Sequence, residues 1–93
     1  MDQQRMELSI KGRVQGVGFR NFTVKTAKKL SGTTGWVKNE SDGTVSLVAE
    51  GPMDELDTLK EAVEEGPSFA NVTGIEENRT SPTGTFDTFK VRY

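Results

Sequence analysis

The hydrophobic pattern of the first thirty residues changes its period once, at a glycine-rich turn, and this change limits the possible folds. Apolar and polar residues alternate over residues 5–14, which predicts a half-buried strand. The turn is Gln-Gly-Val-Gly at residues 15–18. From Phe19 onward the apolar residues recur at helical spacing, so we expect a helix that ends before Gly32. The chain therefore begins with a strand, a tight turn and a helix.

The rest of the chain follows the same two periods. Two strand-like segments flank an Asp-Gly turn, a second helix begins at a proline, and two more strand-like segments follow that helix. These elements are expected over residues 35–39, 44–50, 52–65, 72–77 and 88–93. The βαββαβ order predicts an α+β, ferredoxin-like sandwich, in which two helices pack on one face of a four- to five-stranded antiparallel sheet.

The size and composition exclude several classes of protein. With 93 residues the chain is long enough for one domain, which we expect to span residues 1–93 with residues 1–4 as a flexible tail. The chain has no Cys and no His, so it lacks a thiol nucleophile, thiolate metal ligands and the commonest general base. We see no signal peptide or membrane span and expect a cytoplasmic monomer.

Opposite charges dominate the two halves of the chain. Residues 1–39 contain eight basic and two acidic side chains, whereas residues 40–93 contain four basic and twelve acidic ones. This division favours a small anion at the first half over a long polyanion, which would also lie beside the acidic half. We therefore expect no nucleic-acid partner.

The turn between the first strand and the first helix is the segment that suggests chemistry. Glycines there let successive backbone amides converge, and a helix N-terminus adds partial positive charge, so the turn predicts an anion-binding loop. Arg20 stands in the first helical turn, where its charge opposes the helix dipole unless an anion compensates it. A plain glycine turn is the alternative.

Two motifs in order resemble the acylphosphatase family. The first is Gly-Arg-Val-Gln-Gly-Val-Gly-Phe-Arg at residues 12–20, and the second is Gly-Trp-Val-Lys-Asn at residues 35–39, followed by Asp-Gly-Thr-Val at 42–45. The resemblance extends to the terminal Phe-Lys-Val-Arg-Tyr at 89–93. It implies hydrolysis of small acyl phosphates, of the acetyl phosphate type, to a carboxylate and inorganic phosphate, which binds as product or inhibitor.

The resemblance also implies which residues form the site. The loop amides would bind the phosphoryl group, Arg20 would clamp it with its side chain, and Asn39 would position the attacking water. Glu40 places an acidic residue next to Asn39. The residues of the amide cradle would be Gln15, Gly16, Val17, Gly18, Phe19 and Arg20.

The predicted site suits this reaction because a carboxylate is a good leaving group that needs no general acid. Phosphoryl transfer depends mainly on positioning and on charge stabilisation. We expect water to attack phosphorus directly, with no covalent intermediate, no metal and no other cofactor. Two alternatives remain at this stage: a catalytically silent module that binds phosphate or an acyl phosphate, and an RNA-binding domain of the same topology.

Overall fold

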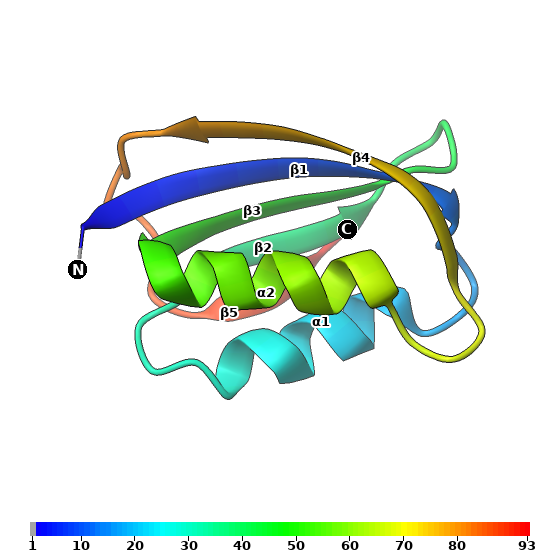
Figure 1. Cartoon of the computed structure of the whole chain (residues 1–93), viewed down its shortest axis with the longest axis horizontal. Coiled ribbons are helices and arrows are strands. Elements are labelled where there is room, and N and C mark those ends of the chain that lie inside the picture. Colours follow the sequence, from blue (N-terminus) through cyan, green and yellow to red (C-terminus); the bar gives the residue numbers. More distant parts are fainter. Residues whose placement is uncertain (1) are drawn as a thin grey trace.

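The computed structural model describes residues 2–93 and arranges them in two layers, a sheet and a pair of helices (Figure 1). Over these residues the elements are β1 (Gln3–Arg13), α1 (Phe19–Lys28), β2 (Thr34–Asn39), β3 (Val45–Pro52), α2 (Met53–Glu65), β4 (Asn71–Thr80) and β5 (Phe89–Arg92). The α+β, ferredoxin-like architecture expected from the pattern is confirmed, and the last strand-like segment forms a fifth strand, β5, after the βαββαβ order. Within the described part of the chain, no helix is long and apolar enough to cross a membrane.

The sheet is mixed, so the expectation of a purely antiparallel sheet is wrong. Its strand order is β4-β1-β3-β2-β5, and β5 runs parallel to β2. The remaining neighbours are antiparallel. β4 and β2 run in opposite directions, so β4 finishes at the same end of the sheet at which β2 starts. From there the chain passes across this end of the sheet, from one outer strand to the other, and enters β5 parallel to β2.

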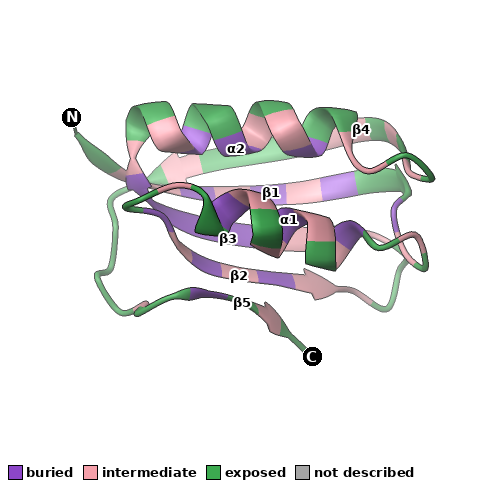
Figure 2. Ribbon diagram, turned by 90° about the horizontal axis from the view of Figure 1, so that it is seen from below, coloured by how far each residue is buried: buried purple, intermediate pink, exposed green. Residues whose placement is uncertain are grey.

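Both helices cover the same face of the sheet, and the core lies between the two layers (Figure 2). The alternating residues of β1 face this core, and β3 contributes a matching row across the strand pairing. From α2 the buried residues are Leu56, Leu59 and Val63, and from α1 they are Phe19, Thr23 and Ala27. Burying one Leu-sized side chain stabilises the fold by about 1.5–3 kcal/mol. This packing holds α1 against β2 and β5.

The structure differs from the sequence expectation at the ends of three elements. Gln3 and Gln4 pair with β3, so the predicted tail is wrong for these two residues, and Met1 lies outside the described residues. Pro52 precedes α2 as its N-cap residue and does not start the helix. β4 extends to Thr80, well beyond the expected strand.

A buried carboxylate fastens the β4–β5 connection to the sheet. Glu50, near the end of β3, is 5% exposed and accepts hydrogen bonds from the amides of Thr83 and Gly84, both at 2.9 Å. The Thr83 hydroxyl and the Arg5 guanidinium donate to it as well, at 2.8 and 3.0 Å. Burial raises the pKa of this carboxyl group, but these four donors outweigh burial and lower the pKa to about 2. Glu50 is therefore charged in the folded protein at neutral pH.

Candidate functional site

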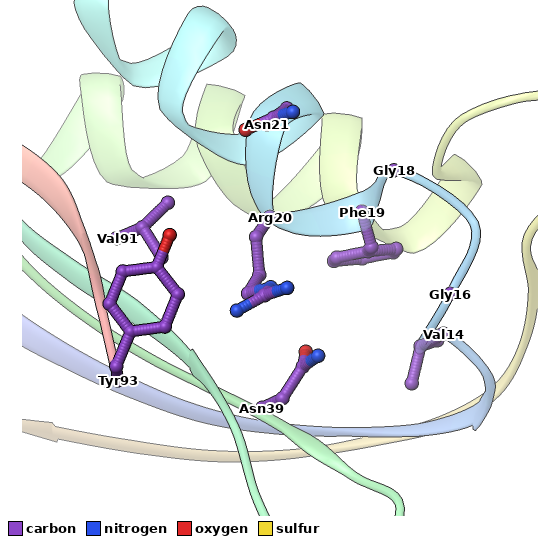
Figure 3. A pocket seen from close by; sticks show the side chains of 9 residues that line it. All are labelled: Val14, Gly16, Gly18, Phe19, Arg20, Asn21, Asn39, Val91 and Tyr93. Atoms are coloured by element: carbon purple, nitrogen blue, oxygen red, sulfur yellow. The ribbon is translucent and has the colours of Figure 1, made fainter.

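A small cavity lies where the start of α1 meets the end of β2 (Figure 3). Its volume is about 190 Å³, enough for a phosphoryl group with a small substituent. The residues that line it are Val14, Gly16, Gly18, Phe19, Arg20, Asn21, Asn39, Val91 and Tyr93. The structure thus brings the glycine loop, Arg20 and Asn39 together around one space.

The loop between β1 and α1 contains two glycines whose conformation suits an anion-binding turn. Gly16 and Gly18 have φ angles of 73° and 78°, in the left-handed region that favours glycine. Such residues between right-handed neighbours turn successive N–H groups toward one concave side. Gly18 is also the N-cap residue of α1 and supplies no side-chain acceptor, and the first turn of α1 contains no acidic residue. The first amides of the helix are therefore left for an external acceptor.

Four of the six predicted cradle residues line the cavity, and the other two do not. Gly16, Gly18, Phe19 and Arg20 face it, although the Phe19 side chain itself is buried in the core. Val17 packs partly against the core. The Gln15 side chain instead reaches toward the β2–β3 turn, where its amide makes two hydrogen bonds.

Arg20 extends from the first turn of α1 into the cavity, where it faces Asn39 (Figure 3). Its guanidinium lies over the ring of Tyr93, with 5.5 Å between the guanidinium carbon and the ring centroid. This contact restrains a long side chain and covers one face of the cation without neutralising it. The cavity therefore carries a positive charge opposite a neutral carboxamide.

Asn39 is the last residue of β2 and pairs in register with Val45 of β3. Its side chain points toward the Arg20 guanidinium (Figure 3). The side-chain oxygen Oδ1 is buried and accepts no hydrogen bond from any residue between 2 and 93. An unpaired buried acceptor costs about 1–3 kcal/mol, and here the described residues leave one hydrogen-bonding position of the Asn39 carboxamide unfilled beside the cavity.

The turn after Asn39 is tightly closed. The Glu40 amide donates to the Thr44 carbonyl at 2.9 Å, and the Asp42 carboxylate accepts from the amide and hydroxyl of Thr44 at 3.0 and 2.7 Å. The hydrogen bond from the Thr44 hydroxyl, and to a smaller extent the bond from its amide, lowers the pKa of Asp42. The carboxylate that holds the turn therefore stays ionised. The Glu40 carboxylate does not line the cavity and lies 4.0 Å from the ammonium group of Lys38.

Four lining residues were not identified from the sequence as parts of the site. Val14 follows the end of β1, Asn21 follows Arg20 on α1, and Val91 and Tyr93 come from the last strand and the residue after it. Tyr93 could be predicted only as one member of an alternating strand, because its contact with Arg20 joins residues 73 positions apart. Trp36 of the second motif lies outside this cavity, and the guanidinium carbon of Arg92 lies 5.0 Å from the centroid of its ring.

The lining side chains can bind an anion but offer little acid–base chemistry. The polar side chains of the cavity are one guanidinium, two neutral carboxamides and one phenol hydroxyl, from Arg20, Asn21, Asn39 and Tyr93. None of the described lining residues is an Asp or a Glu. In the part of the chain that the structure describes, no three or more Asp or Glu side chains gather as a candidate metal site. The arrangement can hold a phosphoryl group and orient a neutral molecule beside it.

Comparison with known proteins gives one consistent family. A family model described as Acylphosphatase matches residues 6–91. An acylphosphatase of Salinibacter ruber is 51% identical over 90 residues, which cover 97% of this chain and 94% of that protein. An acylphosphatase of Syntrophotalea carbinolica is 45% identical over 89 residues, or 96% of each chain. The crystal structure of acylphosphatase from Bacillus subtilis superimposes with a TM-score of 0.92 at 39% identity and covers 97% of this chain and 99% of that one.

Proposed function

This chain belongs to the acylphosphatase family, and we propose that it hydrolyses small acyl phosphates with Arg20 as the phosphoryl clamp and Asn39 as the residue that positions water. The loop amides from Gln15 to Arg20 would surround the phosphoryl oxygens. The observation that carries this assignment is that the Asn39 carboxamide, whose Oδ1 is unpaired, points toward the Arg20 guanidinium at one cavity beside the glycine loop.

Asn39 would hold the attacking water through one hydrogen bond to its carboxamide group. That hydrogen bond leaves a lone pair of the water oxygen free to point at phosphorus, which the amide cradle and Arg20 hold nearby. Asn39 has no basic group and cannot take the proton. In a loose transition state the water keeps its proton until late, so a phosphoryl oxygen can accept it.

The bond changes are simple. An O–P bond forms from water, and the bond between phosphorus and the carboxyl oxygen breaks. The carboxylate leaves with the electron pair of that bond, and the transferred proton stays on inorganic phosphate. Arg20 and the helix N-terminus stabilise the negative charge of the phosphoryl oxygens throughout.

We also propose that the enzyme works as a cytoplasmic monomer without a metal ion. Support for the monomer is that the helices and the sheet of one chain already enclose the core. Support for the location is that an acyl phosphate is a charged, short-lived anhydride, which does not cross membranes and must be hydrolysed in the compartment where it is formed. For metal independence, Arg20 supplies the positive charge that a metal ion would otherwise provide.

The test measures release of phosphate from acetyl phosphate with a chelator present, for the wild type, Arg20→Ala and Asn39→Ala. We expect Arg20→Ala to lower kcat/KM by about 10²–10³-fold and to weaken inhibition by inorganic phosphate. Asn39→Ala should lower kcat by about 10²-fold while phosphate inhibition stays nearly unchanged, because Asn39 touches the water and not the anion.

Two matched controls separate these effects from general damage. The control for Arg20→Ala is Lys25→Ala, which removes one positive charge from the exposed side of α1. The control for Asn39→Ala is Asn71→Ala, which replaces an asparagine by alanine at the exposed start of β4. Both should retain wild-type turnover. If well-folded Arg20→Ala retained it too, Arg20 would not be the clamp. A wild-type protein that binds inorganic phosphate but hydrolyses no acyl phosphate would be a silent phosphate-binding module.

A further inference from the structure

The side chain of Gln15 connects the glycine loop to the turn that follows Asn39. Its Nε2 group donates one hydrogen bond to the Glu40 carbonyl at 2.7 Å and another to the Thr44 carbonyl at 2.9 Å. From this geometry we propose that Gln15 is a positioning residue, which sets the place of the Asn39 carboxamide relative to the cradle. The inference rests on the proposed role of Asn39 in binding water.

The turn does not need Gln15 for its own closure. The Glu40 carbonyl also accepts from the Gly43 amide at 3.3 Å, and the Thr44 carbonyl also accepts from the Glu40 amide at 2.9 Å. Asp42 holds Thr44 through two more bonds. Each carbonyl that Gln15 reaches thus keeps a backbone partner without it. The two bonds from Gln15 serve to join the turn to the glycine loop.

The two bonds fall on both sides of Asn39. Glu40 follows Asn39 directly, and Thr44 precedes Val45, its register partner on β3. Asn39 is therefore the last paired residue of β2 before the turn, and the end of a strand pair is the part of the ladder that opens most easily. Gln15 fastens this end to the loop that would hold the phosphoryl group.

This connection affects the part of the reaction that depends most on distance. Gly16 and Gly18 follow Gln15 in the same loop, so one short segment carries both the cradle and the tether. If the tether is lost, the cradle keeps its amides and its conformation, but Asn39 can move relative to phosphorus. A displacement of about 1 Å in such a group can lower a rate by about 10²-fold. Phosphate binding, by contrast, does not involve Asn39.

The test replaces Gln15 by methionine, which has a similar length and no amide, and measures kcat for acetyl phosphate and the inhibition constant of inorganic phosphate. We expect Gln15→Met to lower kcat by about 10–100-fold while the inhibition constant changes less than about twofold. Gln15→Asn keeps the amide on a side chain about 1.5 Å shorter and should lower kcat as well. Gln3→Met makes the same substitution at an exposed position of β1 and should have wild-type kinetics.

A double-mutant cycle decides through which residue Gln15 acts. If it acts through Asn39, then Gln15→Met in the Asn39→Ala background should change kcat less than about twofold. Equal losses in both backgrounds, an unchanged kcat in folded Gln15→Met, or a rise of the inhibition constant equal to the loss of kcat would each overturn the inference. These results differ from failure of the proposed function itself, in which Asn39→Ala alone would keep wild-type turnover.

Discussion

Replacing Glu50 by glutamine should remove a pH-dependent contribution to stability whose size follows from its surroundings. The pKa of Glu50 falls from 4.5 in an unstructured chain to about 2 in the folded protein. A shift of that size corresponds to about 3 kcal/mol of stability, present when the group is charged in both states. Glutamine has nearly the same shape, but its NH₂ group would face a donor, Thr83 or Gly84, on either side.

The direction of the pH dependence follows from the lowered pKa. The stabilisation from Glu50 is fully present at pH values above its pKa in the unfolded chain, near 4.5. It is lost as the pH falls toward the folded-state pKa of about 2. By pH 3 the wild type should have lost about 2 of the 3 kcal/mol, whereas the glutamine variant has nothing to lose at this position. The gap in unfolding free energy between the two proteins should therefore shrink by about 2 kcal/mol from pH 7 to pH 3.

The assay is urea unfolding followed by the fluorescence of Trp36, the one tryptophan in the sequence, at several pH values. Subtracting the two proteins cancels other carboxylates with lowered pKa that do not contact the Glu50 cluster, such as Glu55 and Glu77, which both proteins share. A gap that stays constant with pH, or that is below about 1 kcal/mol at pH 7, would refute the reasoning. Turnover per folded molecule should not change, because Glu50 pairs with Thr34 at the opposite end of β2 from Asn39.

Three further predictions concern the backbone, the cavity wall and pH. A side chain at Gly35 would place its Cβ 1.9 Å from the Val48 carbonyl oxygen, and the φ of this residue is 145°. Gly35→Ala should therefore lower the unfolding free energy by about 3 kcal/mol or more. In the same urea titration the control Gly74→Ala, whose Cβ would meet open space, should lower it by less than about 1 kcal/mol. Tyr93→Ala frees the Arg20 guanidinium and should raise the inhibition constant of inorganic phosphate about two- to fivefold, and Tyr93→Phe should restore it; wild-type inhibition in Tyr93→Ala would mean that the ring does not restrain Arg20. Because no carboxylate is among the described lining residues and the sequence lacks His and Cys, kcat should vary less than about threefold from pH 5 to 8, and a sharp bell-shaped profile in stopped-flow assays would reveal an overlooked acid or base.

The element order could be predicted because periodicity reports which residues face the core. The predictions of the end of β4 and of the direction of β5 were wrong, because burial does not determine the residue pattern at either place. In β4, Asn78 and Thr80 face outward and Arg79 bonds to Gln4 and Asp57, so this end of the strand carries polar side chains on both faces. Such a segment has no alternation to detect, although its backbone pairs fully with β1. Likewise, the parallel entry of β5 depends on the path of the connection and not on the residues of the strand.

The site could be predicted in its parts but not in its assembly. The glycine pattern indicates an anion-binding loop, and Arg20 stands next to that loop in the sequence. Nothing in the spacing of residues 20 and 39 places their side chains face to face, and the motif resemblance supplied that step. Tyr93 and the tether from Gln15 arise from contacts between distant segments, which a single sequence does not reveal.

The loop around Gly16 and Gly18 presents main-chain groups, and this decides which experiments can detect its part in binding. Alanine scanning replaces side chains and leaves every N–H in place, so it would report only the conformational damage at the two glycines. Chemical synthesis of a chain of this length, with single amides exchanged for esters, would delete one donor at a time and leave the fold intact. The same property lets mutations accumulate in the loop without loss of its donors, provided that the left-handed turns persist.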